Sequence, residues 1–115
     1  MKVQITINVS EKSLLGAITD FIEDGDAIGC IMDGCETPNI EQYNLDGYDE
    51  KEFAARLIKV INANKYDLEF EDADGNLRNF KVFNNATVKT IVEKLLPHLN
   101  LKKYYDEYIA ERDED

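Results

Sequence analysis

"KYDLEFEDADGNLRNFKVF", residues 65–83, carries the pattern that decides the fold. Apolar and charged side chains alternate before an Asp-Gly pair, and successive side chains of a strand point to opposite faces. The segment therefore predicts a β-hairpin with one buried face and one solvated face. A row of carboxylates lies on the solvated face: Asp67, Glu69 and Glu71.

The alternation of side chains between the two faces of each strand restricts the register of this hairpin. A two-residue turn at Asp74-Gly75 would set Glu69 opposite Phe80 and mix the two faces. A three-residue loop at 74–76 keeps the faces separate, so we expect that register or an equivalent bulge. Its pairs are Phe70 with Phe80 and Leu68 with Val82 on the buried face, and Glu69 with Lys81 on the solvated face.

The chain before the hairpin begins with a predicted strand and a predicted helix. Residues 2–9, KVQITINV, alternate apolar and polar side chains with a period of two. Residues 10–25, SEKSLLGAITDFIEDG, place apolar side chains at helical spacing. Ser10 or Ser13 is the expected N-cap, and Gly25 the expected stop.

A second strand is expected at residues 27–32, AIGCIM, because a continuous apolar run is typical of a central strand buried on both faces. Asp33-Gly34 predicts a turn after it. Residues 34–47 are long for a bare loop, so they contain either a short strand at 40–45 or a functional lobe.

Three further helical segments are expected. Residues 48–64 carry an apolar stripe at Phe53, Leu57, Ile58 and Ile61, with acidic residues near the start. A second segment begins at a cap among Asn84, Asn85 and Thr87, and is interrupted at Pro97. The third, within 101–115, has the spacing of a docked helix at Leu101, Tyr105, Tyr108 and Ile109, before an acidic end that frays.

This order of elements predicts one acidic α+β domain over residues 1–115. The expected architecture is a two-layer sandwich: a mainly antiparallel sheet of four or five strands, with about three helices packed on one face. The other face of the sheet is expected to be polar.

The charge of the chain limits its partners. The formal net charge is −11, which repels nucleic acid and anionic lipid and favours a basic protein partner. We therefore expect no direct nucleic-acid binding. No apolar run approaches the ~20 residues of a membrane helix, and no early segment resembles a secretory signal, so we expect a cytoplasmic protein without membrane contact.

Motifs for catalysis or metal binding are sparse. Cys30 and Cys35 are expected to be reduced, Cys30 in the core and Cys35 in a loop, although Cys35 could pair with His98 as a nucleophile and base. One histidine and two cysteines fall short of a closed zinc site. Residues 72–76, DADGN, resemble the start of a calcium loop, but its twelfth position is Phe83 rather than an acid. We expect no enzyme activity, metal or cofactor.

The hairpin and the C-terminal segment carry the candidate partner-binding residues. They are Asp67, Glu69, Glu71, Asp72, Asp74, Tyr104, Tyr105, Asp106, Glu107, Tyr108 and Glu111. The acids offer charge and the tyrosines aromatic anchors, unless Tyr105 and Tyr108 pack on the body of the protein. Side chains two apart on a strand lie ~6.8 Å apart, about half the linear phosphate density of a duplex strand, so imitation of DNA requires a second acidic row.

The leading functional hypothesis is a non-enzymatic acidic protein, monomeric or homodimeric, that occupies a basic surface of another macromolecule. An inhibitor or DNA mimic acting on a nucleic-acid-processing enzyme, of the phage or plasmid anti-defence type, would have this size and charge. One alternative is a small-ligand binder or minor enzyme that uses the segment DGCETPN, residues 33–39. A self-associating structural protein is another, and the acids can also serve solubility alone.

Overall fold

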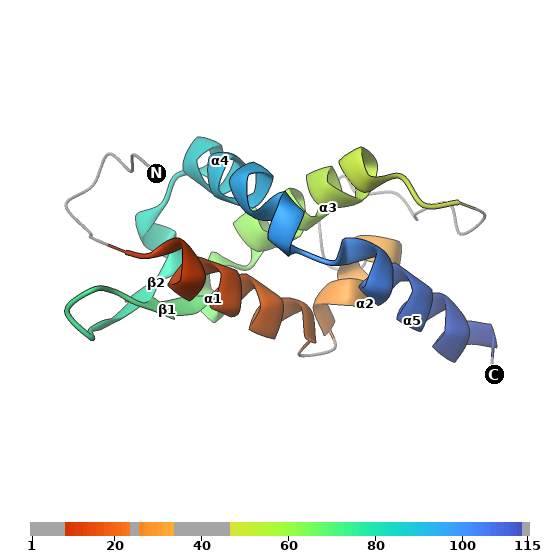
Figure 1. The fold of residues 1–115 in the computed structure, drawn as a ribbon, viewed down its shortest axis with the longest axis horizontal. Helices are drawn as coiled ribbons and strands as arrows, with labels where there is room; N and C mark the ends of the chain where they lie inside the picture. The colour runs from red at the N-terminus through yellow and green to blue at the C-terminus, as the bar shows by residue number, and fades with distance from the viewer. Residues whose placement is uncertain (1–8, 24–25, 34–46, 114–115) are drawn as a thin grey trace.

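The computed structural model describes residues 9–23, 26–33 and 47–113 (Figure 1). In this part of the chain, five α-helices form the body and one hairpin supplies the only sheet, which has two strands. The elements are α1 (Glu11–Glu23), α2 (Asp26–Asp33), α3 (Glu50–Ala63), η1 (Lys65–Asp67), β1 (Glu69–Glu71), β2 (Leu77–Asn79), η2 (Phe80–Val82), α4 (Asn85–Leu95), η3 (Leu96–His98) and α5 (Leu101–Asp113).

The predicted α+β sandwich is therefore wrong. Its helices do not cover a four- or five-stranded sheet; they pack on one another. Helix α1 contacts α2, α4 and β1, while α3 contacts α2, α4 and α5. The strand expected at 2–9, apart from Val9, lies outside the described residues, as do the segment 34–46, Gly25 and the last two residues.

The expected helices α1, α3 and α4 are confirmed, and side-chain caps fix where they begin. The Ser10 hydroxyl accepts from the Ser13 amide at 3.1 Å. Asp49 accepts from the Glu52 amide, and Asn84 from that of Thr87. Their buried stripes repeat at helical spacing: Leu14, Ile18 and Ile22 in α1, Phe53, Leu57 and Ile61 in α3, and Val88, Ile91, Val92 and Leu95 in α4.

Helix α2 replaces the strand predicted at 27–32. Ala27, Cys30, Ile31 and Met32 of this helix are buried, and the last three belong to the hydrophobic core. Arg56 of α3 supports this conformation, since its Nη1 donates to the Ile31 carbonyl oxygen at 2.9 Å. The apolar run at 27–32 has no polar positions that would distinguish the helical period of about 3.6 residues from the strand period of two. The pattern alone therefore led to the wrong prediction of a strand.

The hairpin is confirmed, but the predicted register is wrong. The observed pairs are Glu69 with Asn79, Phe70 with Arg78 and Glu71 with Leu77. The three-residue loop lies one position earlier than expected, at 73–75, because Gly75 takes a φ of 82° at its last position. The Gly75 amide donates to the Asp72 carbonyl at 3.0 Å, and the Asp72 amide to the Asn76 carbonyl at 2.9 Å.

This register changes the burial and the contacts of the residues that follow β2. The chain turns into η2, which buries Phe80 completely and leaves Val82 38% exposed instead of buried. Lys81 does not lie opposite Glu69; its Nζ lies 4.0 Å from the centre of the Tyr66 ring. Phe80 instead joins an aromatic cluster with Phe70 and Phe83, whose ring centroids are 5.3–5.5 Å apart.

The C-terminal helix docks on the opposite end of the body. Helix α4 ends at Leu95, and Pro97 lies in the 3-10 turn η3, as expected. Helix α5 follows, and its Tyr105 packs against Phe53 and Tyr48. The molecule is elongated, 46 × 24 × 22 Å, with the hairpin near one end and the C-terminal part of α5 at the other (Figure 1). None of the helices in the described residues has the length and apolar character needed to cross a membrane.

Candidate binding surfaces

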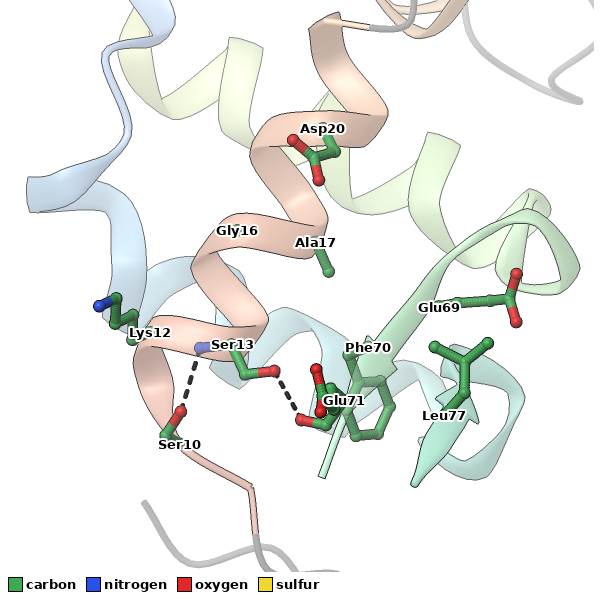
Figure 2. Close-up of a pocket in the computed structure, with 10 residues that line it drawn as sticks. All are labelled: Ser10, Lys12, Ser13, Gly16, Ala17, Asp20, Glu69, Phe70, Glu71 and Leu77. Carbon is green, nitrogen blue, oxygen red and sulfur yellow. Dashed lines mark hydrogen bonds between the residues drawn. The ribbon is translucent and has the colours of Figure 1, made fainter. Parts of the chain in front are cut away.

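A groove of about 500 Å³ separates α1 from the hairpin (Figure 2). We call it the α1–hairpin groove. Its lining residues are Ser10, Lys12, Ser13, Gly16, Ala17 and Asp20 from the α1 side, and Glu69, Phe70, Glu71 and Leu77 from the hairpin. The groove is open and shallow, so it suits a segment of another macromolecule better than an enclosed small ligand.

A hydrogen bond joins α1 to β1 beside the groove. The Ser13 hydroxyl donates to the Glu71 carbonyl oxygen at 2.6 Å (Figure 2). Ser13 is held in place because its amide donates to the Ser10 cap at the start of α1. The alternation of β1 then buries Phe70 and exposes Glu69 and Glu71 on the side of the strand that faces solvent.

Acidic side chains dominate the polar lining of the groove. Asp20, Glu69 and Glu71 are exposed, and none forms an ion pair with another described residue. Lys12 is the basic residue among those lining it, and Figure 2 shows its side chain directed away from β1. The groove therefore has a negative potential, which attracts cationic groups.

Apolar surface lies between these carboxylates. Leu77 is 67% exposed, and Ala17 points toward the hairpin (Figure 2). A Cβ placed on Gly16 would meet nothing within 4 Å, so the helix leaves open space there. An apolar surface with acids around it is complementary to an arginine or lysine side chain, which has an apolar stem and a charged head.

The structure separates the predicted hairpin acids by role. Glu69 and Glu71 line the groove, and Figure 2 shows the Glu69 side chain directed away from α1. Asp67 lies in η1 rather than on the strand, and Asp74 is exposed in the loop. The three-carboxylate row predicted for one strand is thus reduced to two on β1. Asp72 is buried and holds the loop.

Asp72 is bound on both carboxylate oxygens. Oδ1 accepts from the amides of Asp74 at 3.0 Å and Asn76 at 2.9 Å, and Oδ2 accepts from Nε of Arg78 at 2.8 Å. Its side chain is 4% exposed. The Arg78 guanidinium, together with these amides, lowers the pKa of the Asp72 carboxyl below its ordinary value. With both oxygens engaged, Asp72 stabilises the hairpin rather than offering charge to a partner.

The predicted C-terminal residues form a second concavity, which we call the α5 pocket. It has a volume of about 190 Å³ and is lined by Ile22, Glu23, Ile28, Tyr104, Glu107, Tyr108 and Glu111. The Tyr104 hydroxyl donates to Oε1 of Glu23 at 3.1 Å. Burial, and then the hydrogen bond to Glu23, raise the pKa of Tyr104 to about 12, so the phenol stays neutral at physiological pH.

Two other C-terminal candidates have structural contacts. Tyr105 is 6% exposed and belongs to the core, the role left open for it by the sequence. Asp106 is exposed and forms an ion pair with Lys102 of the same helix at 2.9 Å. Glu107, Tyr108 and Glu111 line the α5 pocket.

The two acidic regions do not form one surface. The hairpin and the end of α5 lie toward opposite ends of the molecule (Figure 1). The second row that a DNA mimic requires is therefore not supplied to the hairpin by α5. Sequence reasoning also missed Asp20 and Glu23, whose relevant signal was the polar side of α1 opposite the stripe Leu14, Ile18 and Ile22.

The residues considered for chemistry have simpler placements. Cys30 is buried, which confirms its place in the core, and His98 is exposed in η3. Cys35 and the segment 34–39 lie outside the described residues, so the Cys35–His98 pairing stays a hypothesis. Across residues 9–23, 26–33 and 47–113, no three histidine, cysteine or acidic side chains are grouped to hold a metal ion.

Comparison with protein-family models, curated proteins and solved structures finds no match to this chain.

Proposed function

We propose that this protein is a non-enzymatic binding protein whose α1–hairpin groove receives a basic segment on the surface of a partner protein. The observation that carries the proposal is the combination of apolar surface with Asp20, Glu69 and Glu71, which form no ion pair with another described residue. A net charge of −11 adds long-range attraction, which raises the rate of encounter with a cationic partner.

The spacing of the acids favours a basic protein surface over close imitation of a duplex. β1 carries two exposed carboxylates, and the acids of α5 lie toward the far end of the molecule. A nucleic-acid-processing enzyme remains a suitable partner class, because its substrate groove is basic whether or not the inhibitor copies phosphate geometry.

Affinity capture from a lysate of the native host at low and high salt, followed by titration of the purified partner, tests this proposal. We expect the double variant Glu69→Lys/Glu71→Lys to weaken binding by about tenfold or more, because each substitution replaces attraction with repulsion. Binding by the wild type should also weaken as salt rises, since added ions screen exposed charges.

The double variant Glu107→Lys/Glu111→Lys is the matched control. It changes the net charge equally but alters the α5 pocket instead of the groove. Equal loss of affinity in both variants would show that only total charge matters and that the groove is not the site. A partner that binds equally well to the wild type and the groove variant would also contradict the proposal.

A further inference from the structure

The α5 pocket is built differently from the groove and lies beyond it along α1, since Asp20 lines the groove and Glu23 lines the pocket. Ile22 and Ile28, from α1 and α2, supply apolar surface, and α5 supplies Tyr104 and Tyr108. Helix α5 packs against α2, which fixes this side of the pocket. At about 190 Å³ it is smaller than the ~300–1,000 Å³ of sites for drug-sized ligands, so it accepts only a small group.

The lining of the α5 pocket is acidic, so it favours a positively charged group. Glu23, Glu107 and Glu111 line the pocket, and no lysine or arginine is found among its described lining residues. Glu23 is held by the Tyr104 hydroxyl. Because that hydroxyl donates to a carboxylate oxygen, it orients Glu23 and adds no positive charge to the pocket.

Aromatic rings add a second attraction for a cation. The face of a tyrosine ring attracts an ammonium group within ~6 Å of its centroid. Nζ of Lys103 lies 5.8 Å from the centre of the Tyr104 ring, close to the limit of this range, so an incoming ammonium group competes with it for that ring. An ammonium group on an alkyl stem would satisfy both the apolar and the acidic parts of the lining.

A metal ion fits the pocket poorly. Small hard cations need several oxygen ligands at ~2.0–2.6 Å. No three acids of the described residues are grouped in that way, although three line this pocket. Among the described residues, the lining therefore offers a small metal ion no grouped set of oxygen ligands.

We propose that the α5 pocket binds an alkylammonium group, with Tyr104 and Tyr108 against its stem and Glu23, Glu107 and Glu111 near its charge. This site is separate from the α1–hairpin groove and does not depend on the function proposed for that groove. The ammonium group belongs either to a lysine side chain of another protein or to a free amine.

Titration of the ¹⁵N-labelled protein with n-butylammonium, followed by amide NMR shifts, tests the pocket directly. We expect saturable shifts at residues of the pocket, with a dissociation constant of about 1–10 mM for so small a group. Neutral n-butanol, which has a similar shape, should bind at least several-fold more weakly. A short peptide with one lysine and the diamine putrescine distinguish the two sources, because the natural source should bind more tightly than butylammonium.

Variants separate the contributions of charge and ring. Glu107→Gln/Glu111→Gln should weaken butylammonium binding several-fold, whereas the control Glu69→Gln/Glu71→Gln should leave it unchanged. Tyr104→Leu should weaken binding by about two- to fivefold through loss of the ring face. Tyr104→Phe keeps the ring but loses the hydroxyl that holds Glu23, so it should retain more affinity than Tyr104→Leu, and circular dichroism spectra that match the wild type show that each variant is folded.

Three outcomes would overturn this inference: no saturable shift with butylammonium, equal binding of butanol and butylammonium, or shifts that appear in the groove rather than the pocket. Each leaves the groove proposal intact, because that proposal is tested with a protein partner and groove variants. Loss of partner binding in those groove variants would likewise leave the alkylammonium site untouched.

Discussion

At the scale of single residues, Asp72 shows how a buried acid can stabilise the fold. Its carboxylate accepts hydrogen bonds from two loop amides and from Arg78. Only the ionised form accepts at both oxygens from all three donors, so the fold favours the charged carboxylate. The same segment places Asp74 in solvent, where its side chain is exposed.

We expect Asp72→Asn to lower the melting temperature by about 4–8 °C at neutral pH, because the charged contact with Arg78 is lost. Thermal unfolding followed by circular dichroism measures the change. Asp74→Asn, two positions away, should have almost no effect.

The difference between wild type and Asp72→Asn should also depend on pH. The folded-state pKa of Asp72 lies below the ordinary value of 3.8, so the ionised carboxylate contributes its full stability above that value. The contribution is lost as the pH falls below about 4 and through the folded-state pKa. A gap in melting temperature that stays constant down to pH 2 would contradict this assignment.

At the scale of elements, long amphipathic stripes are predictable and short segments are not. Helices α1, α3 and α4 have several turns of apolar periodicity and side-chain caps, so local sequence determines them. Helix α2 has eight residues, and its conformation is settled by packing against α1, α3 and α5. Contacts with other helices decide the conformation of α2, and the sequence pattern does not reveal these contacts.

The hairpin illustrates the same limit within one element. Its existence and loop length could be predicted from alternation and the Asp-Gly pair. Its register could not be predicted, because a shift of the pairing by two residues leaves every side chain on the same face. The choice between these registers rests on Gly75 and the Asp72 hydrogen bonds. Glu69 and Glu71 were predicted at the site, whereas Asp20 joins them only when α1 packs beside β1.

Two substitutions in η2 test the observed register. Phe80→Ala should destabilise the protein by about 3–5 kcal/mol, because the ring is fully buried in the aromatic cluster. Val82→Ala should cost less than about 1 kcal/mol, since Val82 is 38% exposed. Urea unfolding gives both values, and a similar large loss at both positions would favour the register in which Val82 is buried.

At the scale of the whole molecule, negative charge exceeds what ion pairs neutralise. The net charge is −11, and several described pairs, such as Lys94–Glu11 and Lys102–Asp106, join exposed groups. Exposed pairs of this kind contribute only ~0–1 kcal/mol each. Repulsion among the remaining acids therefore acts against the compact state.

We expect added sodium chloride to raise the melting temperature, because ions screen this repulsion. Melting curves at low and moderate salt measure the effect. The quadruple variant Glu69→Lys/Glu71→Lys/Glu107→Lys/Glu111→Lys, which reduces the net negative charge by two units per substitution, should respond less to salt. A melting temperature that falls with salt would show that specific ion pairs outweigh the general repulsion.

Helix α1 borders both candidate sites, since Asp20 lines the groove and Glu23 lines the α5 pocket. A helix rises about 1.5 Å per residue, so these two acids are only ~4.5 Å apart along the helix axis. A short linker between two cationic groups therefore allows both sites to be occupied at once, with a gain in avidity. In a series of double-headed cationic peptides, affinity should reach its maximum at a short linker and fall as the linker lengthens.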